Sequence, residues 1–262
     1  MATTQFIGTL DELWRFPVKS MRGERLTEAF VTEQGIQGDR AYALLDVETE
    51  RVVSASNAHF PGILECTAAF VDDSVAPPVR ITLPSGASAT SDSPALSALL
   101  SDYFHRETEL IATIPASYAS RQAEFFTEVG LALTAPTQSF MDLCPLSLIS
   151  TATLASLGHD RRRFRMNVIV QTEGDGFLDN AWLHHHLTIG ERLQLAVTML
   201  DPRCVMTTLP QQELPKDPSI LRQIVERNSQ PIGMGKARPC AGVYASILQP
   251  GTIRRGEPVM FG

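Results

Sequence analysis

The chain has 262 residues, of which 44% are hydrophobic, and its 22 Lys and Arg against 29 Asp and Glu give a formal net charge of −7. This apolar share is typical of a globular protein and excludes wholesale disorder. The acidic balance disfavours nucleic acid as a partner, and no apolar run approaches the ~20 residues of a membrane-spanning helix. Four widely spaced cysteines without a C-x-x-C pair, and the lack of a secretory signal, predict a cytoplasmic protein without a membrane anchor.

The first half of the chain predicts strands joined by glycine turns. Apolar runs at 26–32, 41–46 and 79–83 are strand-like, and glycines or prolines separate them. Pro94 then opens a helix whose apolar residues recur at helical spacing up to residue 104. A small-residue segment at 112–120 is the candidate boundary, so we expect one domain over residues 1–118 and a second over residues 119–262.

The second half predicts more strands around two short helices. Residues 146–149 and 165–171 are strand-like, and between them Ser150 can cap a helix that Gly158 ends. The other predicted elements are a strand run at 187–199 that bends at Gly190, a helix opened by Pro218 with an apolar face at Ile220, Leu221, Ile224 and Val225, and closing strands at 243–248 and 258–261. Because strands outnumber helices, the fold class is mainly β with several helices (α+β), and barrel-like.

Cys204 is the first candidate for chemistry. It follows a long apolar run and Arg203, whose positive charge can hold the thiol as a thiolate. The alternative is a buried structural cysteine, which is the commoner state of a free cysteine. The other three cysteines are expected to pack in the core.

Arg165 and Asn167 form the second candidate. Residues two apart on a strand point to the same face, so these two side chains would project together while Met166 faces the other way. A forked cation beside an amide can grip a phosphate or the edge of a heterocycle. The alternative is an exposed strand face.

Two segments near the N-terminus offer further groups for an anion. Lys19 and Ser20 present an ammonium and a hydroxyl at a strand end, without the spacing of a Walker loop. Gly35 and Gly38 bracket a tight turn that ends in Asp39 and Arg40. The alternative for this turn is an ordinary hairpin with a surface ion pair.

Three successive histidines, His184 to His186, raise the question of a metal site. Neighbours on a strand alternate sides, so at most two of the three imidazoles converge, and no cysteine or H-E-x-x-H motif stands near them. We therefore expect an exposed polar stretch.

In combination these segments resemble a known family. Residues 13–20 and 35–40 strongly resemble the N-terminal β-barrel domain found with MOSC (molybdenum cofactor sulfurase C-terminal) domains. Residues 142–146, 163–167, 203–208 and 242–244 resemble the MOSC domain itself. The resemblance spans nearly the whole chain and extends to the mitochondrial amidoxime-reducing component and its bacterial relatives.

The resemblance implies a MOSC β-barrel preceded by an N-terminal MOSC-associated β-barrel domain. It also implies a molybdenum-cofactor-dependent oxidoreductase that reduces N-hydroxylated or related N–O substrates, with Cys204 as the catalytic residue and the molybdenum ligand. The molybdopterin contacts that it implies are Lys19, Ser20, Arg40, Asp142, Cys144, Arg165, Asn167 and Arg203. Electrons would come from a separate donor protein of the ferredoxin, flavodoxin or cytochrome b5 type with its reductase.

The sequence departs from the family pattern in three places. Met166 stands where the family often has proline, Asp179 corresponds only loosely to an acidic residue before a tryptophan, and the loop at 207–211 lacks an aspartate. Two alternatives stay open, namely a sulfur carrier with a persulfide on Cys204 and a carrier of the molybdenum cofactor without turnover. Retention of the whole set of implied contacts favours cofactor binding over sulfur transfer, whereas enzyme and carrier look alike in sequence.

Overall fold

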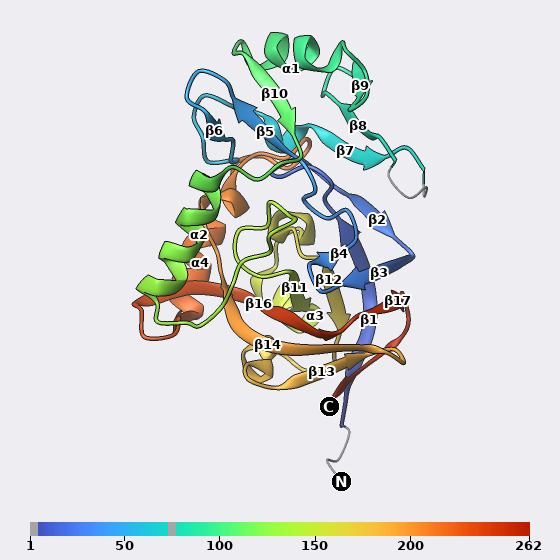
Figure 1. Cartoon of the computed structure of the whole chain (residues 1–262). Coiled ribbons are helices and arrows are strands. Elements are labelled where there is room, and N and C mark those ends of the chain that lie inside the picture. Colours follow the sequence, from blue (N-terminus) through green and yellow to red (C-terminus); the bar gives the residue numbers. More distant parts are fainter. Residues whose placement is uncertain (1–4, 73–76) are drawn as a thin grey trace.

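A closed β-barrel occupies the lower part of the computed structural model, which describes residues 5–72 and 77–262 (Figure 1). Its seven strands follow the order β11 (Leu146–Ser150), β12 (Val168–Gln171), β1 (Gln5–Arg15), β18 (Pro258–Phe261), β13 (His186–Ile189), β14 (Leu193–Pro202) and β16 (Ala237–Gln249). The barrel closes because β16 also pairs with β11. β11 and β12 run parallel, and the other neighbours are antiparallel.

The barrel core is built by strand alternation. Along β14, Leu195, Val197 and Met199 are buried and point inward, while the residues between them are more exposed. Leu10 and Leu13 of β1 belong to the same core, so the first strand of the chain completes a barrel that the second half of the chain begins. Burying each such aliphatic side chain stabilises the fold by roughly 1.5–3 kcal/mol.

A second layer, the upper unit, packs above the barrel in Figure 1. It consists of two small sheets with helix α1 (Leu96–Phe104), and Leu100 of that helix packs with Phe60 in a separate core. Its strands are β5 (Ala43–Asp46), β6 (Arg51–Val52), β7 (Thr67–Phe70), β8 (Val79–Thr82), β9 (Ser88–Thr90) and β10 (Thr108–Ile111). This separate core makes the upper unit a distinct layer above the barrel.

The remaining strands lie beside the barrel. β3 (Glu28–Thr32) pairs with β4 (Gly35–Ile36) and with β17 (Gly251–Arg254), which joins the N-terminal and C-terminal ends of the chain in one sheet. β2 (Glu24–Leu26) extends β1, and β15 (Ser229–Pro231) extends β16.

Three more α-helices complete the described structure: α2 (Ala116–Glu128), α3 (Thr151–Leu157) and α4 (Ser219–Arg227). The predicted ends of α3 are confirmed, because the Ser150 side chain accepts a hydrogen bond from the Thr153 N–H and Gly158 ends the helix with φ 68°. The short 3-10 helices are η1 (Ile63–Glu65), η2 (Arg161–Phe164), η3 (Leu178–Trp182) and η4 (Val205–Thr208). Over the two described stretches, no helix combines the length and the apolar character needed to cross a bilayer.

Three predictions of secondary structure are wrong in part. The strand predicted at 165–171 begins only at Val168, because Arg165 ends η2 with a left-handed backbone. β17 was not predicted, and Val225 of α4 is 48% exposed, so the apolar face of that helix is narrower than expected.

The predicted division after residue 118 falls inside α2, and β1 of the first predicted domain is a barrel strand. Two cores nevertheless exist, one in the barrel and one in the upper unit. The division into residues 1–118 and 119–262 stays a prediction.

Substitution of Gly242 on β16 tests how tightly the barrel closes against β11. Its φ is +86°, and an added Cβ would lie 2.6 Å from the carbonyl oxygen of Leu148 on β11. We expect Gly242→Ala to lower the free energy of unfolding by about 3 kcal/mol, because left-handed strain and overpacking add. The midpoint of urea denaturation measures this loss.

Gly86 is the matched control. It has the same φ of +86° and open space around its Cβ position. Gly86→Ala therefore retains the strain without the clash, and we expect a loss of about 1 kcal/mol. Equal losses in the two variants would contradict tight closure at β11 and β16.

Candidate functional site

Two adjoining cavities lie where the upper unit meets the barrel. The inner chamber, of about 60 Å³, is lined by Lys19, Ser20, Arg40, Phe140, Ser147 and Arg165 among others. The outer cleft, of about 500 Å³, is lined by Tyr118, Arg121, Cys204 and Arg238 among others. Both cavities share Lys19, Asp142, Asp201, Arg203, Met206 and Tyr244 in their walls, so they form one continuous site.

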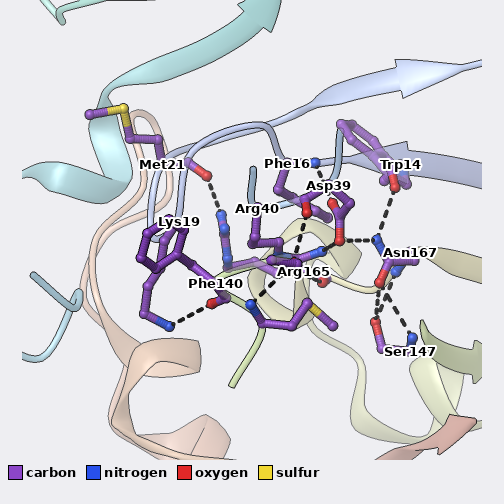
Figure 2. Close-up of polar contacts among 12 residues, drawn as sticks. Trp14, Phe16, Lys19, Met21, Asp39, Arg40, Phe140, Ser147, Arg165 and Asn167 are labelled. Atoms are coloured by element: carbon purple, nitrogen blue, oxygen red, sulfur yellow. Dashed lines mark hydrogen bonds and ion pairs between the residues drawn. The ribbon is translucent and has the colours of Figure 1, made fainter. Parts of the chain in front are cut away.

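Arg165 carries a buried positive charge without a carboxylate partner. Its guanidinium donates a hydrogen bond to the Met21 carbonyl and lies 4.4 Å from the centre of the Phe16 ring (Figure 2). Arg40 lies 4.3 Å from the same ring, but it forms an ion pair with Asp39. Burial and the neighbouring Arg40 lower the pKa of Arg165 to about 9. The inner chamber therefore holds a cation that is paired with none of the described carboxylates.

Asp39 and Asn167 form a hydrogen-bonded hub that holds Arg40, which in turn donates to the Arg165 carbonyl at 3.2 Å. Asp39 accepts hydrogen bonds from the Phe16 N–H at 2.8 Å, from Arg40, and from the Asn167 amide at 3.1 Å. Asn167 also donates to the Trp14 carbonyl, and its oxygen accepts from the Ser147 hydroxyl (Figure 2). Asp39 is 4% exposed. The Asp39–Arg40 pair is thus buried, and the surface hairpin pair considered from the sequence is wrong.

Three residues of the inner chamber adopt a left-handed backbone. The φ angles are 65° for Ser20, 48° for Arg40 and 52° for Arg165. These are three of the seven non-glycine residues with positive φ in the described chain. Such a backbone costs on the order of 1–3 kcal/mol per residue and tends to occur at functional sites. The left-handed backbone at Arg165 turns its side chain toward the inner chamber, a direction that the alternation of an extended strand does not give.

Lys19 and Asp142 pair at the mouth of the inner chamber. The Lys19 ammonium also donates to the Phe140 carbonyl at 3.3 Å, and the Tyr118 hydroxyl donates to Asp142 at 3.2 Å. Burial favours the neutral form of Asp142, but Lys19 and the Tyr118 hydrogen bond outweigh it and lower its pKa. Asp142 is therefore an ionised anchor for Lys19.

Arg203 has an unused hydrogen-bond donor. It pairs with Asp201 and donates to the Phe164 carbonyl, yet its Nε is buried without a partner. Burial raises the pKa of Asp201 to about 6, although Arg203 acts in the opposite direction. An orphaned guanidinium donor in the wall of both cavities suits a ligand with an acceptor oxygen.

Cys204 lies at the end of β14, where η4 begins, and lines the outer cleft. It is exposed, whereas the other three cysteines are buried, so the structural alternative considered for Cys204 is wrong. Burial raises the pKa of Cys66, Cys144 and Cys240 to about 12. Of the four thiols, Cys204 alone is open to a ligand.

The structure brings together most of the residues that the sequence selects. Lys19, Ser20, Arg40, Asp142, Arg165 and Arg203 line the inner chamber, and Cys204 lines the cleft that adjoins it. Asn167 is fully buried behind the chamber and supports Asp39. Asn167 and Cys144 are the exceptions, because both are buried and line neither cavity, and Cys144 packs in the barrel core. The position of Cys144 fits the packing role expected from the residues alone better than the cofactor contact that the family resemblance implies.

Two other sequence features lie outside the site. Asp179 is fully buried and accepts a hydrogen bond from the Ser150 N–H. The histidines at 184, 185 and 186 are exposed, as expected. Across residues 5–72 and 77–262, no three His, Cys, Asp or Glu side chains are grouped so as to hold a metal ion.

Sequence reasoning missed several residues of the site. Tyr118 and Arg121 lie in and beside the segment taken as a linker, whereas the structure places both on α2. Asp201 interrupts the apolar end of β14 three residues before Cys204, and a charge at that place was a usable signal. Ser147 and Arg238 gave none, because their roles depend on pairing between distant strands.

Comparison with known proteins agrees with this geometry. Residues 7–108 match the MOSC N-terminal beta barrel domain, and residues 139–260 match the MOSC domain. Mitochondrial amidoxime reducing component 2 of Homo sapiens is 24% identical over 289 residues, which cover 97% of this chain and 84% of that protein. Mitochondrial amidoxime-reducing component 1 of Mus musculus is 23% identical and covers 97% and 82% respectively.

Among solved structures, the YUAD protein from Bacillus subtilis aligns with a TM-score of 0.45 at 11% identity, over 99% of this chain and 96% of that one. The two domain matches together contain the core of the upper unit, most of the barrel core, Cys204 and every residue that lines the inner chamber. The chain therefore carries a MOSC N-terminal beta barrel domain ahead of a MOSC domain.

Proposed function

We propose that this protein is a molybdenum-cofactor-dependent oxidoreductase that reduces N-hydroxylated or related N–O compounds. The observation that carries the proposal is the unpaired, buried charge of Arg165 in a chamber that adjoins the exposed thiol of Cys204. The names of the amidoxime-reducing relatives supply the reaction class.

The residues of the inner chamber fit an anionic, hydrogen-bonding cofactor. Arg165 lacks a carboxylate, and the Arg203 Nε lacks an acceptor, so a phosphate or a pterin oxygen would satisfy both. Lys19, Ser20 and Arg40 complete the contacts, while Asn167 holds the hub behind them. When bound, the molybdenum cofactor supplies two-electron redox chemistry at its metal.

Cys204 is suited to bind that metal from the protein side. Its thiol is exposed to the cleft and follows directly on Arg203, whose side chain reaches the inner chamber. A soft thiolate matches a metal that is already held by the sulfur atoms of a dithiolene. The substrate then enters through the outer cleft, and a separate electron-donor protein of the ferredoxin, flavodoxin or cytochrome b5 type supplies the electrons.

Arg165→Met separates cofactor binding from folding. We expect cofactor content to fall by about ten-fold or more, because the substitution removes a charged contact. The melting temperature of the cofactor-free protein should stay level or rise, because an apolar side chain replaces a buried, unpaired charge. Metal analysis and pterin fluorescence measure the first effect, and thermal denaturation measures the second.

Arg162→Met is the control for Arg165. Arg162 pairs with Asp160 and Glu213 and lines neither the inner chamber nor the outer cleft, so it should retain the cofactor. If Arg165→Met kept its full cofactor content, Arg165 would not be a cofactor contact. Failure of Arg165→Met to fold would make its role structural.

Cys204→Ala and Cys204→Ser test the metal ligand. We expect reduction of benzamidoxime to fall by on the order of 100-fold or more in both variants, since loss of a ligand exceeds the effect of losing a supporting contact. Pterin content should persist, because the chamber residues are intact. The melting temperature should stay close to wild type, because the side chain is exposed. The measurements use protein made in a host that synthesises the cofactor.

Cys66→Ala is the matched control, because Cys66 is buried in the core of the upper unit. It should lose stability and retain activity. Full activity in Cys204→Ala would exclude the ligand role. Absence of molybdenum from wild-type protein, together with a persulfide on Cys204, would favour the sulfur carrier instead.

A further inference from the structure

One face of α2 forms a wall of the outer cleft. Tyr118, Arg121, Gln122 and Phe125 all line the cleft, and their spacing of three and four residues places them on the same side of the helix. Gln122 donates to the carbonyls of Met141 and Asp142, which fixes the helix to the mouth of the inner chamber. The wall is therefore anchored beside the site of reaction.

Two arginines line the outer cleft from different elements, Arg121 on α2 and Arg238 on β16. Arg121 and Arg238 line the outer cleft and not the inner chamber, so a cofactor in the chamber would leave them uncovered. Arg121 is exposed over the Tyr118 ring, and no carboxylate in the described part of the chain pairs with it. Arg238 lies over Phe125, and its Nε is buried without a partner.

The charge balance of the cleft leaves these two cations in excess. Lys19 pairs with Asp142 and Arg203 pairs with Asp201, so the acidic groups of the lining are already matched. The one carboxylate on Arg238 is Glu128, at 3.3 Å and 69% exposed. A cationic cleft in a chain of net charge −7 concentrates anions at its mouth.

The position of α2 in the chain gives independent support. Residues 116–128 lie between the two matched segments, 7–108 and 139–260, and belong to neither. The α2 wall with Arg121 is thus a feature that the two domain patterns do not specify, whereas Arg238 lies within the MOSC match. Such a segment is a natural place for substrate preference to differ between relatives.

We propose that the outer cleft selects N–O substrates that carry a negatively charged carboxylate or phosphate group, with Arg121 and Arg238 as the residues that recognise it. Tyr118 and Phe125 flank the arginines and give the cleft aromatic surface for a planar substrate. The inference rests on the proposed reductase function, because it places the N–O group at Cys204 and the anion at α2.

Equilibrium binding tests the selection without turnover. Calorimetry on oxidised, cofactor-loaded protein without an electron donor compares benzamidoxime with its 4-carboxy and 4-phosphono derivatives. We expect the anionic compounds to bind about ten-fold more tightly at low salt, and this preference to shrink at high salt. Comparing the carboxylate and phosphonate shows which anion the cleft prefers.

Substitutions that should lower the preference for anions, and one that should raise it, make the test specific. Arg121→Gln and Arg238→Gln should each reduce the preference for the anionic compounds by roughly three- to ten-fold. Glu128→Gln should increase it, because it frees Arg238 from its ion pair. Arg80→Gln, an equal charge change on the exposed face of β8, should leave binding and activity at wild-type values.

Equal affinity for neutral and anionic compounds would overturn the inference, as would an unchanged preference in Arg121→Gln and Arg238→Gln. Reduction of benzamidoxime by the same preparation tests the proposed function separately. A protein that reduces benzamidoxime without preferring anions refutes the selection alone. A protein that prefers anions but reduces no N–O compound refutes the reductase and the assignment of these anions as substrates.

Discussion

The burial of Arg165 without a carboxylate is the constraint on which the rest of the site depends. An unpaired charge in a protein interior costs several kcal/mol, and a well-packed apolar side chain would avoid that cost. The chain offsets part of it with the Met21 carbonyl and the face of Phe16, and adds left-handed strain at Arg165 itself. A fold that accepts both penalties at one position is arranged for an anion that arrives from outside the chain.

The same constraint explains why the site lies where two parts of the chain meet. Lys19 and Arg40 come from the first forty residues, whereas Arg165 and Arg203 come from the barrel of the second half. Arg165 has no carboxylate and is repelled by Arg40, so the two segments must be fixed by other contacts before they can converge. Asp39 and Asn167 supply such contacts, and β1 ties both segments into a single barrel. Anion binding at this junction therefore depends on the contacts that bring the two segments together.

The sequence was sufficient for the class of fold and for the four cations of the inner chamber, because both are visible in short segments of the chain. Alternation in β14, the Ser150 cap and the segments around Lys19 and Arg40 are all visible over a few residues. It failed where conformation depends on distant contacts. Arg165 looked like a strand residue, but it ends η2 with a left-handed backbone, and its carbonyl accepts a hydrogen bond from the distant Arg40. Tyr118 looked like part of a linker, because small residues precede it and its partner Asp142 lies 24 residues away.

The inner chamber and the outer cleft meet two separate requirements that would conflict within one pocket. Holding a cofactor favours buried cations, and Arg40, Arg165 and Arg203 have side chains that are nearly closed to solvent. Admitting and releasing a small substrate favours accessible groups with weak partners, and Arg121 is exposed while Arg238 is half-buried with an exposed carboxylate as its partner. Cys204 stands at the junction, with its side chain in the cleft and its neighbour Arg203 in the chamber wall. Changes in α2 can therefore alter substrate preference while the buried hub that holds the cofactor stays the same.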